Sequence, residues 1–162
     1  MILVDTSVLV DFFKGMNNKG TQSLDYIIDS GIPYGINEYI YQELLQGSRT
    51  YEEFQKLKEY LETIPFYYLQ YGKESFEKAA LINFTCRREG ITIRSTIDLL
   101  IAETAIENNL YLLQNDRDFQ NLSKIIPELQ LFEKKKPNNC FNRTLLLSQN
   151  LLFASLGKFC AN

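Results

Sequence analysis

The sequence contains no histidine. Without an imidazole side chain the protein can have no Ser–His triad, no Cys–His pair and no histidine general base. A zinc site built on histidine ligands is excluded as well. An enzyme of this composition has to work with carboxylates, lysine, tyrosine or a metal ion held by oxygen atoms. The 20 Asp and Glu residues make a metal ion held by carboxylates the natural choice.

Cysteine is scarce and long apolar runs are missing. Cys86, Cys140 and Cys160 are scattered, so we expect free thiols in a reducing cytoplasm and no zinc cluster. No run reaches the roughly 18 apolar residues of a membrane span. The first residues lack the basic start and the cleavage site of a signal peptide. These absences predict a cytoplasmic protein with no membrane partner.

An excess of positive charge is also missing. The net charge is −3, which gives no general attraction to nucleic acid, so any such binding has to be local. The 162 residues suit one globular domain. Hydrophobic residues make up 45% of the chain and charged residues 23%, which is an ordinary balance for a packed core.

Short apolar runs alternate with amphipathic segments along the chain. They predict strands at residues 2–4, 33–36, 66–69, 111–114 and 129–132. Residues 17–20 are expected to be a polar loop. Helices are predicted at residues 7–13, 23–30, 38–46, 51–63, 73–89, 97–107 and 119–125. The alternation predicts an α/β fold with a mainly parallel sheet of about four or five strands, flanked by helices.

The character of the sequence changes after Glu133. Three lysines and a proline at residues 134–137 are typical of a boundary. Residues 145–156 beyond it are apolar enough to form a helix that is too short to span a membrane. We therefore expect a domain at residues 1–133 and a C-terminal extension at residues 134–162, which could pack on the domain, on another copy or on a partner.

Four acidic residues are predicted to lie at one edge of the sheet. Asp5 ends the first strand, Asp116 follows the strand at residues 111–114, and Glu43 and Asp98 lie on helices near the same edge. Each also has a simpler explanation, as part of a capping turn, a β-turn, a helix start or a solvated helix face. Their joint placement favours a common site, because ligands of parallel sheets bind beyond the C-terminal strand ends.

Clustered carboxylates repel one another, and a cation offsets that cost. Ligands that are all oxygen atoms select a hard divalent ion such as Mg²⁺ or Mn²⁺. If Asp5 is a metal ligand, Thr6 or Ser7 is left to cap the helix that follows it.

Three segments carry a resemblance to a known family. In this order and spacing, ILVDTSVLVDFFKG, NEYIYQELLQG and GITIRSTIDLLIAETAIENNLYLLQNDRDF resemble the PIN-domain ribonucleases, and most of all the VapC-type toxins of toxin–antitoxin pairs. The resemblance covers roughly residues 1–133. It implies a PIN-like α/β/α sandwich in which the catalytic and metal-binding acids are Asp5, Glu43, Asp98 and Asp116.

The resemblance assigns supporting roles too. Thr6 or Ser7 would assist beside Asp5, and Asp118 is close enough to replace Asp116 as the fourth acid. Gln114 stands where the family often has Thr, so a hydroxyl group beside Asp116 is missing.

The implied activity is divalent-metal-dependent endonucleolytic cleavage of RNA. The resemblance also implies a cognate antitoxin, a homodimer, and contact with DNA only indirectly through the antitoxin. Arg94, in the loop before Asp98, is the favoured contact for RNA phosphates. Arg87 and Arg88 are further candidates, although they could equally be a solvated helix end that favours the helix dipole.

Three other functions stay open at this point. A housekeeping RNA-processing nuclease would have the same acids as a toxin. A phosphoacceptor signalling domain also gathers acids around Mg²⁺, but the positions of Glu43 and Asp98 fit it poorly. The third is an interaction protein with a degenerate site, and the presence of all four acids argues against it.

Overall fold

The structure, a computed structural model, describes residues 1–134. Within this range short strands alternate with helices, as the sequence predicts. The elements in chain order are β1 (Ile2–Val4), α1 (Thr6–Phe13), α2 (Lys19–Asp29), β2 (Tyr34–Gly35), α3 (Glu38–Gln46), α4 (Tyr51–Leu61), α5 (Lys73–Arg88), α6 (Thr96–Glu107), β3 (Tyr111–Leu113), α7 (Arg117–Ile125) and β4 (Gln130–Leu131).

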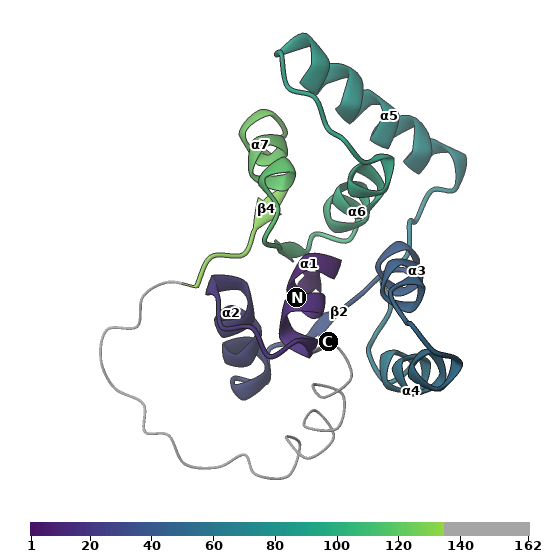
Figure 1. Ribbon diagram of the computed structural model, residues 1–162. Helices are drawn as coiled ribbons and strands as arrows, with labels where there is room; N and C mark the ends of the chain where they lie inside the picture. Colours follow the sequence, from purple (N-terminus) through teal and green to yellow (C-terminus); the bar gives the residue numbers. More distant parts are fainter. Residues whose placement is uncertain (135–162) are drawn as a thin grey trace.

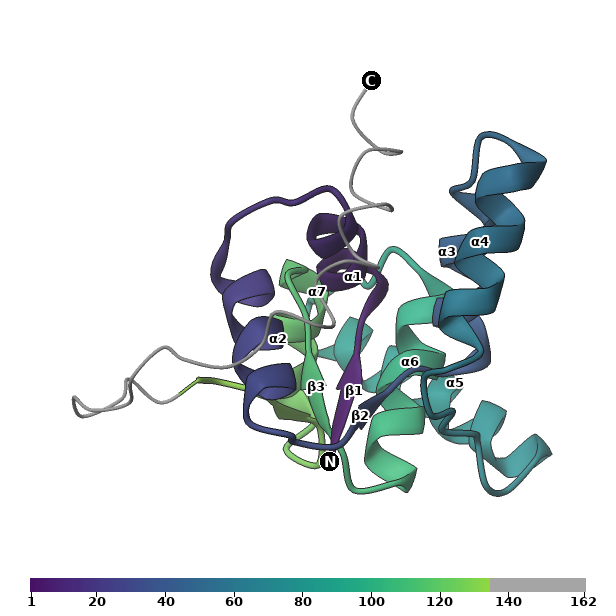
Figure 2. The same ribbon diagram turned by 90° about the horizontal axis from the view of Figure 1, so that it is seen from below.

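The sheet has four strands in the order β2-β1-β3-β4, and every pair of neighbours is parallel. In the register, Ile2 lies opposite both Tyr34 and Tyr111. Figure 2 shows β1, β2 and β3 side by side in the middle of the molecule. All three residues of β1 are buried, because a central parallel strand is covered on both faces. The predicted parallel α/β fold is confirmed.

Helices cover the sheet on both faces (Figure 1). α2 lies on one side of the strands, and α5, α6 and α7 lie on the other, while α3 and α4 lie beyond β2. The middle of α6 is buried from Leu99 to Ala105, and the apolar run from Leu99 to Ala102 packs this helix against the core. A buried hydrogen bond from Asn37 Nδ2 to Thr104 Oγ1, 3.0 Å long, joins the start of α3 to α6.

The predicted strand at residues 66–69 is wrong, because only one bridge, from Ile36 to Phe66, forms there. Pro65 has no N–H to offer. Beyond Tyr67 the end of α6 takes over the backbone groups: the Tyr68 carbonyl accepts a hydrogen bond from Asn108 Nδ2, and the N–H of residue 70 donates to Glu107. These contacts replace the sheet pairing that a longer strand would need.

The predicted loop at residues 17–20 is also wrong in part, because α2 begins at Lys19 rather than at residue 23. Asn18 caps this helix by accepting from the Thr21 N–H, and the Thr21 hydroxyl accepts from the Asn18 N–H. This reciprocal pair satisfies two N–H groups at the helix start. It draws Gly20 into the helix, which passes so close to Asn115 that a Cβ on Gly20 would lie 2.3 Å from Asn115 Oδ1.

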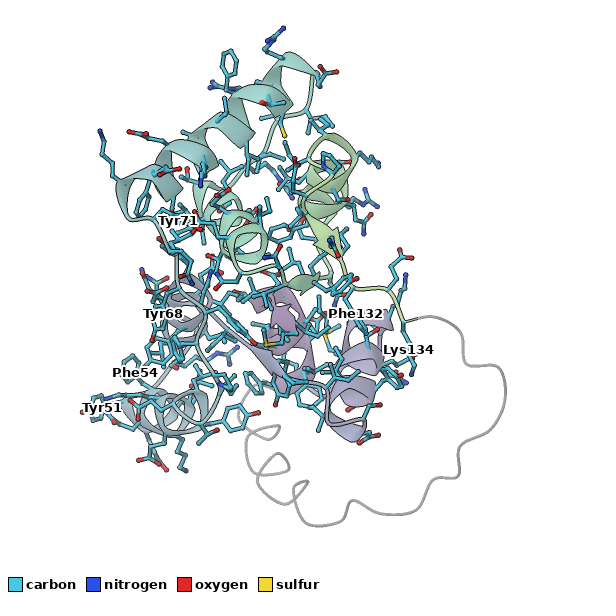
Figure 3. All side chains as sticks on the ribbon, turned by 180° about the vertical axis from the view of Figure 1, so that it is seen from behind. Tyr51, Phe54, Tyr68, Tyr71, Phe132 and Lys134 are labelled. Carbon is cyan, nitrogen blue, oxygen red and sulfur yellow. The ribbon has the colours of Figure 1, made fainter. Side chains whose placement is uncertain are left out.

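The described residues end just after the predicted domain boundary. The Lys134 side chain lies beside α2 (Figure 3), with its Nζ 4.8 Å from the centre of the Tyr26 ring. The predicted apolar helix at residues 145–156 lies outside the described residues, as do Cys140 and Cys160. Cys86 is a buried free thiol. None of the helices described within residues 1–134 has the length and apolar character needed to cross a membrane.

Candidate functional site

Asp5 and Asp116 follow the two adjacent strands β1 and β3, and each is the N-cap of the next helix. Asp5 Oδ2 accepts hydrogen bonds from the Ser7 N–H at 3.0 Å and from Ser7 Oγ at 2.5 Å. Asp116 Oδ1 accepts from the Asp118 N–H at 2.9 Å. Because Val4 pairs with Leu113, the two strand ends lie next to each other and bring the two carboxylates to one edge of the sheet.

The expectation that Thr6 or Ser7 caps α1 is therefore wrong. Asp5 has an extended backbone, with φ −71° and ψ 155°, which is the conformation of an N-cap residue. Thr6 and Ser7 lie inside the first turn, and their hydroxyl groups serve the acids instead. Asp5 can cap the helix and also belong to a functional site, because only its Oδ2 accepts the capping hydrogen bonds.

Burial dominates the electrostatics of Asp5. The residue is 5% exposed, and burial raises the pKa of its carboxyl to about 6, with a smaller rise from the charge of Glu43, although the hydrogen bonds from Ser7 oppose it. Glu43 lies on α3, and its Oε2 accepts a 2.5 Å hydrogen bond from Thr6 Oγ1. Thr6 therefore ties the acid on α3 to the strand end that carries Asp5.

Asp98 lies close enough to the other four acids for their charges to raise its pKa. It lies in the first turn of α6. Ser95 is the N-cap of this helix, and its Oγ accepts a hydrogen bond from the Ile97 N–H. Burial raises the pKa of Asp98 to about 7, and the negative charges of four neighbours add to the rise. In decreasing order these neighbours are Asp5, Asp116, Glu43 and Asp118. No residue in the described range donates a hydrogen bond to the Asp98 carboxylate. Its oxygens therefore have no hydrogen-bond partner among residues 1–134 that a ligand would have to displace.

Asp118 differs from Asp116 in its partners. It is buried, and its Oδ2 accepts a 3.1 Å hydrogen bond from Arg94 Nε. The N–H of Arg94 lies 3.4 Å from the same oxygen. Asp116 is half-exposed, and its Oδ1 is 3.6 Å from Arg94 Nη2. The predicted arginine in the loop before α6 thus lies at the acidic edge, whereas Arg88 lies over the Phe84 ring and Arg87 has no contact with the acids within residues 1–134.

Sequence reasoning named Gln114 but missed the contacts of the polar residues that precede Asp116. Gln114 follows β3, and its Oε1 is buried without a hydrogen-bond partner in the described range. Asn115 donates from its backbone N–H to Ser7 Oγ at 3.1 Å and from Nδ2 to Asp11 Oδ2 at 3.0 Å. Asn18 Nδ2 also donates to Asp11 Oδ2. The partners are up to 108 residues apart, so no spacing in the sequence could reveal them.

The donors at this edge fit a hard divalent cation in their chemistry. The carboxylates repel one another, and carboxylate oxygens are the ligands that Mg²⁺ and related ions prefer. In their present positions, however, no three acidic or cysteine side chains of residues 1–134 are arranged to hold a metal ion. Hydrogen bonds from Thr6, Ser7 and Arg94 occupy part of the carboxylate oxygens.

A second pair of acids lies on α6, two turns after Asp98. Glu103 is buried, and burial together with the charge of Glu107 raises its pKa to about 7. Glu107 accepts a 2.8 Å hydrogen bond from Ser75 Oγ and lies 3.8 Å from Lys78 Nζ. This pair lies between α5 and α6, and none of the acids at the sheet edge contributes to its pKa.

Comparison with known proteins agrees with this geometry. The family model described as "PIN domain" matches residues 2–125. The chain is 28% identical over 126 residues to "VapC ribonuclease Mb1587" of Mycobacterium bovis, and to "Ribonuclease VapC11" of Mycobacterium tuberculosis; each match covers 77% of this chain and 93% of the relative.

Two solved structures share the fold. One is the complex VapBC2 from Rickettsia felis bound to a DNA fragment from their promoter, with a TM-score of 0.64, 21% identity, and coverage of 83% of this chain and 100% of the other. The second is FitAcB from Neisseria gonorrhoeae, with a TM-score of 0.60, 20% identity, and coverage of 82% and 97%. The resemblance noted in the sequence is thus confirmed at the level of the family, and the chain belongs to the PIN-domain family.

Proposed function

We propose that the protein is a divalent-metal-dependent endoribonuclease that hydrolyses RNA phosphodiester bonds. The observation that carries the proposal is the gathering of acids at the C-terminal edge of a parallel sheet, where Asp5 and Asp116 follow two adjacent strands and Thr6 hydrogen-bonds Glu43 next to Asp5. The repulsion among acids in partly buried surroundings is a cost that a bound cation offsets. The relatives named as ribonucleases support RNA as the substrate.

Asp5, Glu43, Asp98 and Asp116 would hold the cation, which we propose to be Mg²⁺ or Mn²⁺. When bound, it supplies acidification of a water molecule and stabilisation of negative charge on the phosphate. Asp116 is a better fourth ligand than Asp118, because Asp118 Oδ2 already accepts hydrogen bonds from the Nε and the backbone N–H of Arg94.

The protein itself orients these acids. Ser7 fixes Asp5 through two hydrogen bonds, and Thr6 fixes Glu43. Ser7 Oγ also accepts from the Asn115 N–H, so one hydroxyl connects the loop before Asp116 with Asp5. Fixed donors of this kind keep ligands in place at little entropic cost when substrate binds.

The proposed chemistry predicts the ends of the RNA products. Attack by water on phosphorus leaves a 5′-phosphate and a 3′-hydroxyl, and it needs neither a histidine nor the ribose 2′-hydroxyl. The test is cleavage of a labelled RNA by purified protein with Mn²⁺, followed by analysis of the ends by mass spectrometry. Products that carry a 2′,3′-cyclic phosphate would rule out this route.

We further propose that the nuclease is a cytoplasmic toxin with a cognate antitoxin. The similarity to proteins named VapC and to the solved VapBC2 complex supports this role. That complex is bound to a promoter fragment, and we propose that the present chain reaches DNA only through its antitoxin. Expression of the chain should arrest growth, and co-expression of a neighbouring gene should relieve the arrest. Growth without arrest would favour a housekeeping nuclease.

A homodimer is also proposed, through the outer face of α5. Phe76, Leu81 and Phe84 are 50%, 60% and 51% exposed on this helix. Lys73 and Lys78 already pair with the two acids of this helix, Glu77 and Glu74, so the proposal rests on the apolar side chains, which a two-fold related copy of the same face would cover. The substitution Phe84→Glu should convert the dimer to a monomer in light scattering, whereas Tyr51→Glu on exposed α4 should not. A dimer that persists in Phe84→Glu would exclude this face.

A further inference from the structure

Arg94 is a cation that already lies on one side of the acidic edge. Its Nε donates to Asp118 Oδ2 over 3.1 Å, and its Nη2 lies 3.6 Å from Asp116 Oδ1. The hydrogen bond to Asp118, and then the charges of Asp118, Asp116 and Asp98, raise the pKa of Arg94, whose guanidinium is charged in any case. One arginine therefore offsets part of the charge that a metal ion would offset.

The two contacts of the guanidinium are unequal. The contact with Asp118 has the length of a hydrogen bond and reaches a buried carboxylate. The contact with Asp116 is longer than a hydrogen bond, and it joins a 74% exposed arginine side chain to a 39% exposed carboxylate. Exposed ion pairs are weak, because water and salt screen them. The contact with Asp116 is therefore the one that gives way.

We propose that Arg94 is an internal counter-ion that gives up Asp116 to the divalent cation, and that it thereby sets the affinity of the site for metal. This inference rests on the proposed function, since it takes Asp116 as a metal ligand. Without metal, Nη2 of Arg94 offsets the charge of Asp116. Once Asp116 holds a cation, two positive groups are adjacent and repel, and Nη2 turns to the solvent while Asp118 keeps Nε.

The exchange has a consequence for RNA. A guanidinium released from Asp116 stays anchored at Asp118, beside the acids, where it can bind a phosphate of the substrate. A phosphate that binds Arg94 and draws it from Asp116 should raise the affinity of the site for metal. By thermodynamic linkage, metal should raise the affinity for phosphate by the same factor. Arg94 would then serve both partners in turn.

The test is the affinity of the full chain for Mn²⁺, measured by electron paramagnetic resonance without RNA. We compare the wild type with Arg94→Gln and with the matched control Arg117→Gln. Arg117 lies between Asp116 and Asp118 in the sequence but has no ion pair with either within residues 1–134. Arg94→Gln should bind Mn²⁺ about two- to fivefold more tightly, the range expected for loss of an exposed ion pair. The gain should shrink in 0.5 M salt, and Arg117→Gln should bind as the wild type does.

Arg94→Lys provides a second measurement, since a lysine can pair with Asp118 but cannot reach both carboxylates with one fork. It should show part of the gain. An equal gain in Arg94→Gln and Arg117→Gln would mean that only net charge matters and would overturn the inference. Unchanged or weaker binding in Arg94→Gln and Arg94→Lys would overturn it as well, while Asp5→Asn still abolishes binding and the proposed function stands. Absence of Mn²⁺ binding in the wild type and in both variants would overturn the proposed function too.

Discussion

Helix α6 carries acids at two places, Asp98 at its start and the Glu103–Glu107 pair further along. The pKa is raised in both places, but the neighbouring residues differ. Asp98 at its start and Glu103, about one and a half turns later, both have a pKa raised to about 7 by burial and by neighbouring carboxylates. The Glu103–Glu107 pair is closed off between α5 and α6, and Ser75 and Lys78 contact Glu107. Asp98 has no hydrogen-bond donor within residues 1–134 and lies at the open end of the sheet. A raised pKa alone therefore does not identify a functional site. What distinguishes Asp98 is that its carboxylate oxygens accept no hydrogen bond from residues 1–134 and that it lies near the edge of the sheet.

The largest expected effect is a loss of RNA cleavage when Asp98 is changed, compared with little loss when Glu103 is changed. Asp98→Asn should lower the rate of RNA cleavage by about 100-fold or more, the scale on which one electrostatic group in an active site contributes. Glu103→Gln, the matched change on the same helix, should leave the rate within about twofold. The measurement is the initial cleavage rate with Mn²⁺, with circular dichroism as the control for folding. Equal losses in the two variants would abolish the distinction.

The second effect concerns stability and pH. The folded protein binds protons on Asp5, Asp98 and Glu103 more tightly than the unfolded chain does, so metal-free protein should lose stability as the pH rises from about 4 to about 7. Asp98→Asn should raise the metal-free stability at pH 8 by about 1–2 kcal/mol, a value reduced for the partial exposure of the site.

Mn²⁺ distinguishes the two contributions. In urea denaturation at pH 5 and pH 8, Mn²⁺ should remove the part of the pH dependence that comes from Asp5 and Asp98 and leave the part from Glu103. A pH dependence that Mn²⁺ does not alter would show that the metal does not bind near Asp98.

The smallest effects come from two serines that each donate to a carboxylate. Ser75→Ala removes the hydroxyl beside Glu107 and should cost about 1–2 kcal/mol of stability without a change in cleavage rate. Ser7→Ala removes a donor that lowers the pKa of Asp5. That pKa should therefore rise above about 6, and the variant should lose more activity at pH 6 than at pH 8. Cleavage rates at the two pH values and urea midpoints test both, and a pH-independent loss in Ser7→Ala would contradict this role for Ser7.

The parts of the fold that the sequence predicts correctly are those decided by local patterns. The strands at residues 2–4 and 111–113 are continuous apolar runs, and the helices predicted at residues 38–46 and 97–107 begin next to the side-chain caps Asn37 and Ser95. The start of α2 was missed although Asn18 and Thr21 have the spacing of a reciprocal cap. The error at residues 66–69 has a different cause, because the side chains of Glu107 and Asn108 that replace the strand lie about 40 residues further along.

The candidate site divides in the same way. The positions of Asp5 and Asp116 at strand ends follow from the apolar runs before them and from the parallel sheet. The pairing of Arg94 with Asp118, and the unpaired Gln114 Oε1, depend on how α6, α7 and β3 pack, which no local spacing encodes. The assignment of the four acids as metal ligands remains a prediction.

The most direct test of the metal-nuclease proposal is RNA cleavage by the wild type and by Asp5→Asn, each with Mg²⁺, with Mn²⁺ and with EDTA. The proposal predicts cleavage by the wild type with either metal, no cleavage after chelation, recovery when Mn²⁺ is returned in excess, and no cleavage by Asp5→Asn under any condition. Cleavage that survives both EDTA and Asp5→Asn would contradict it.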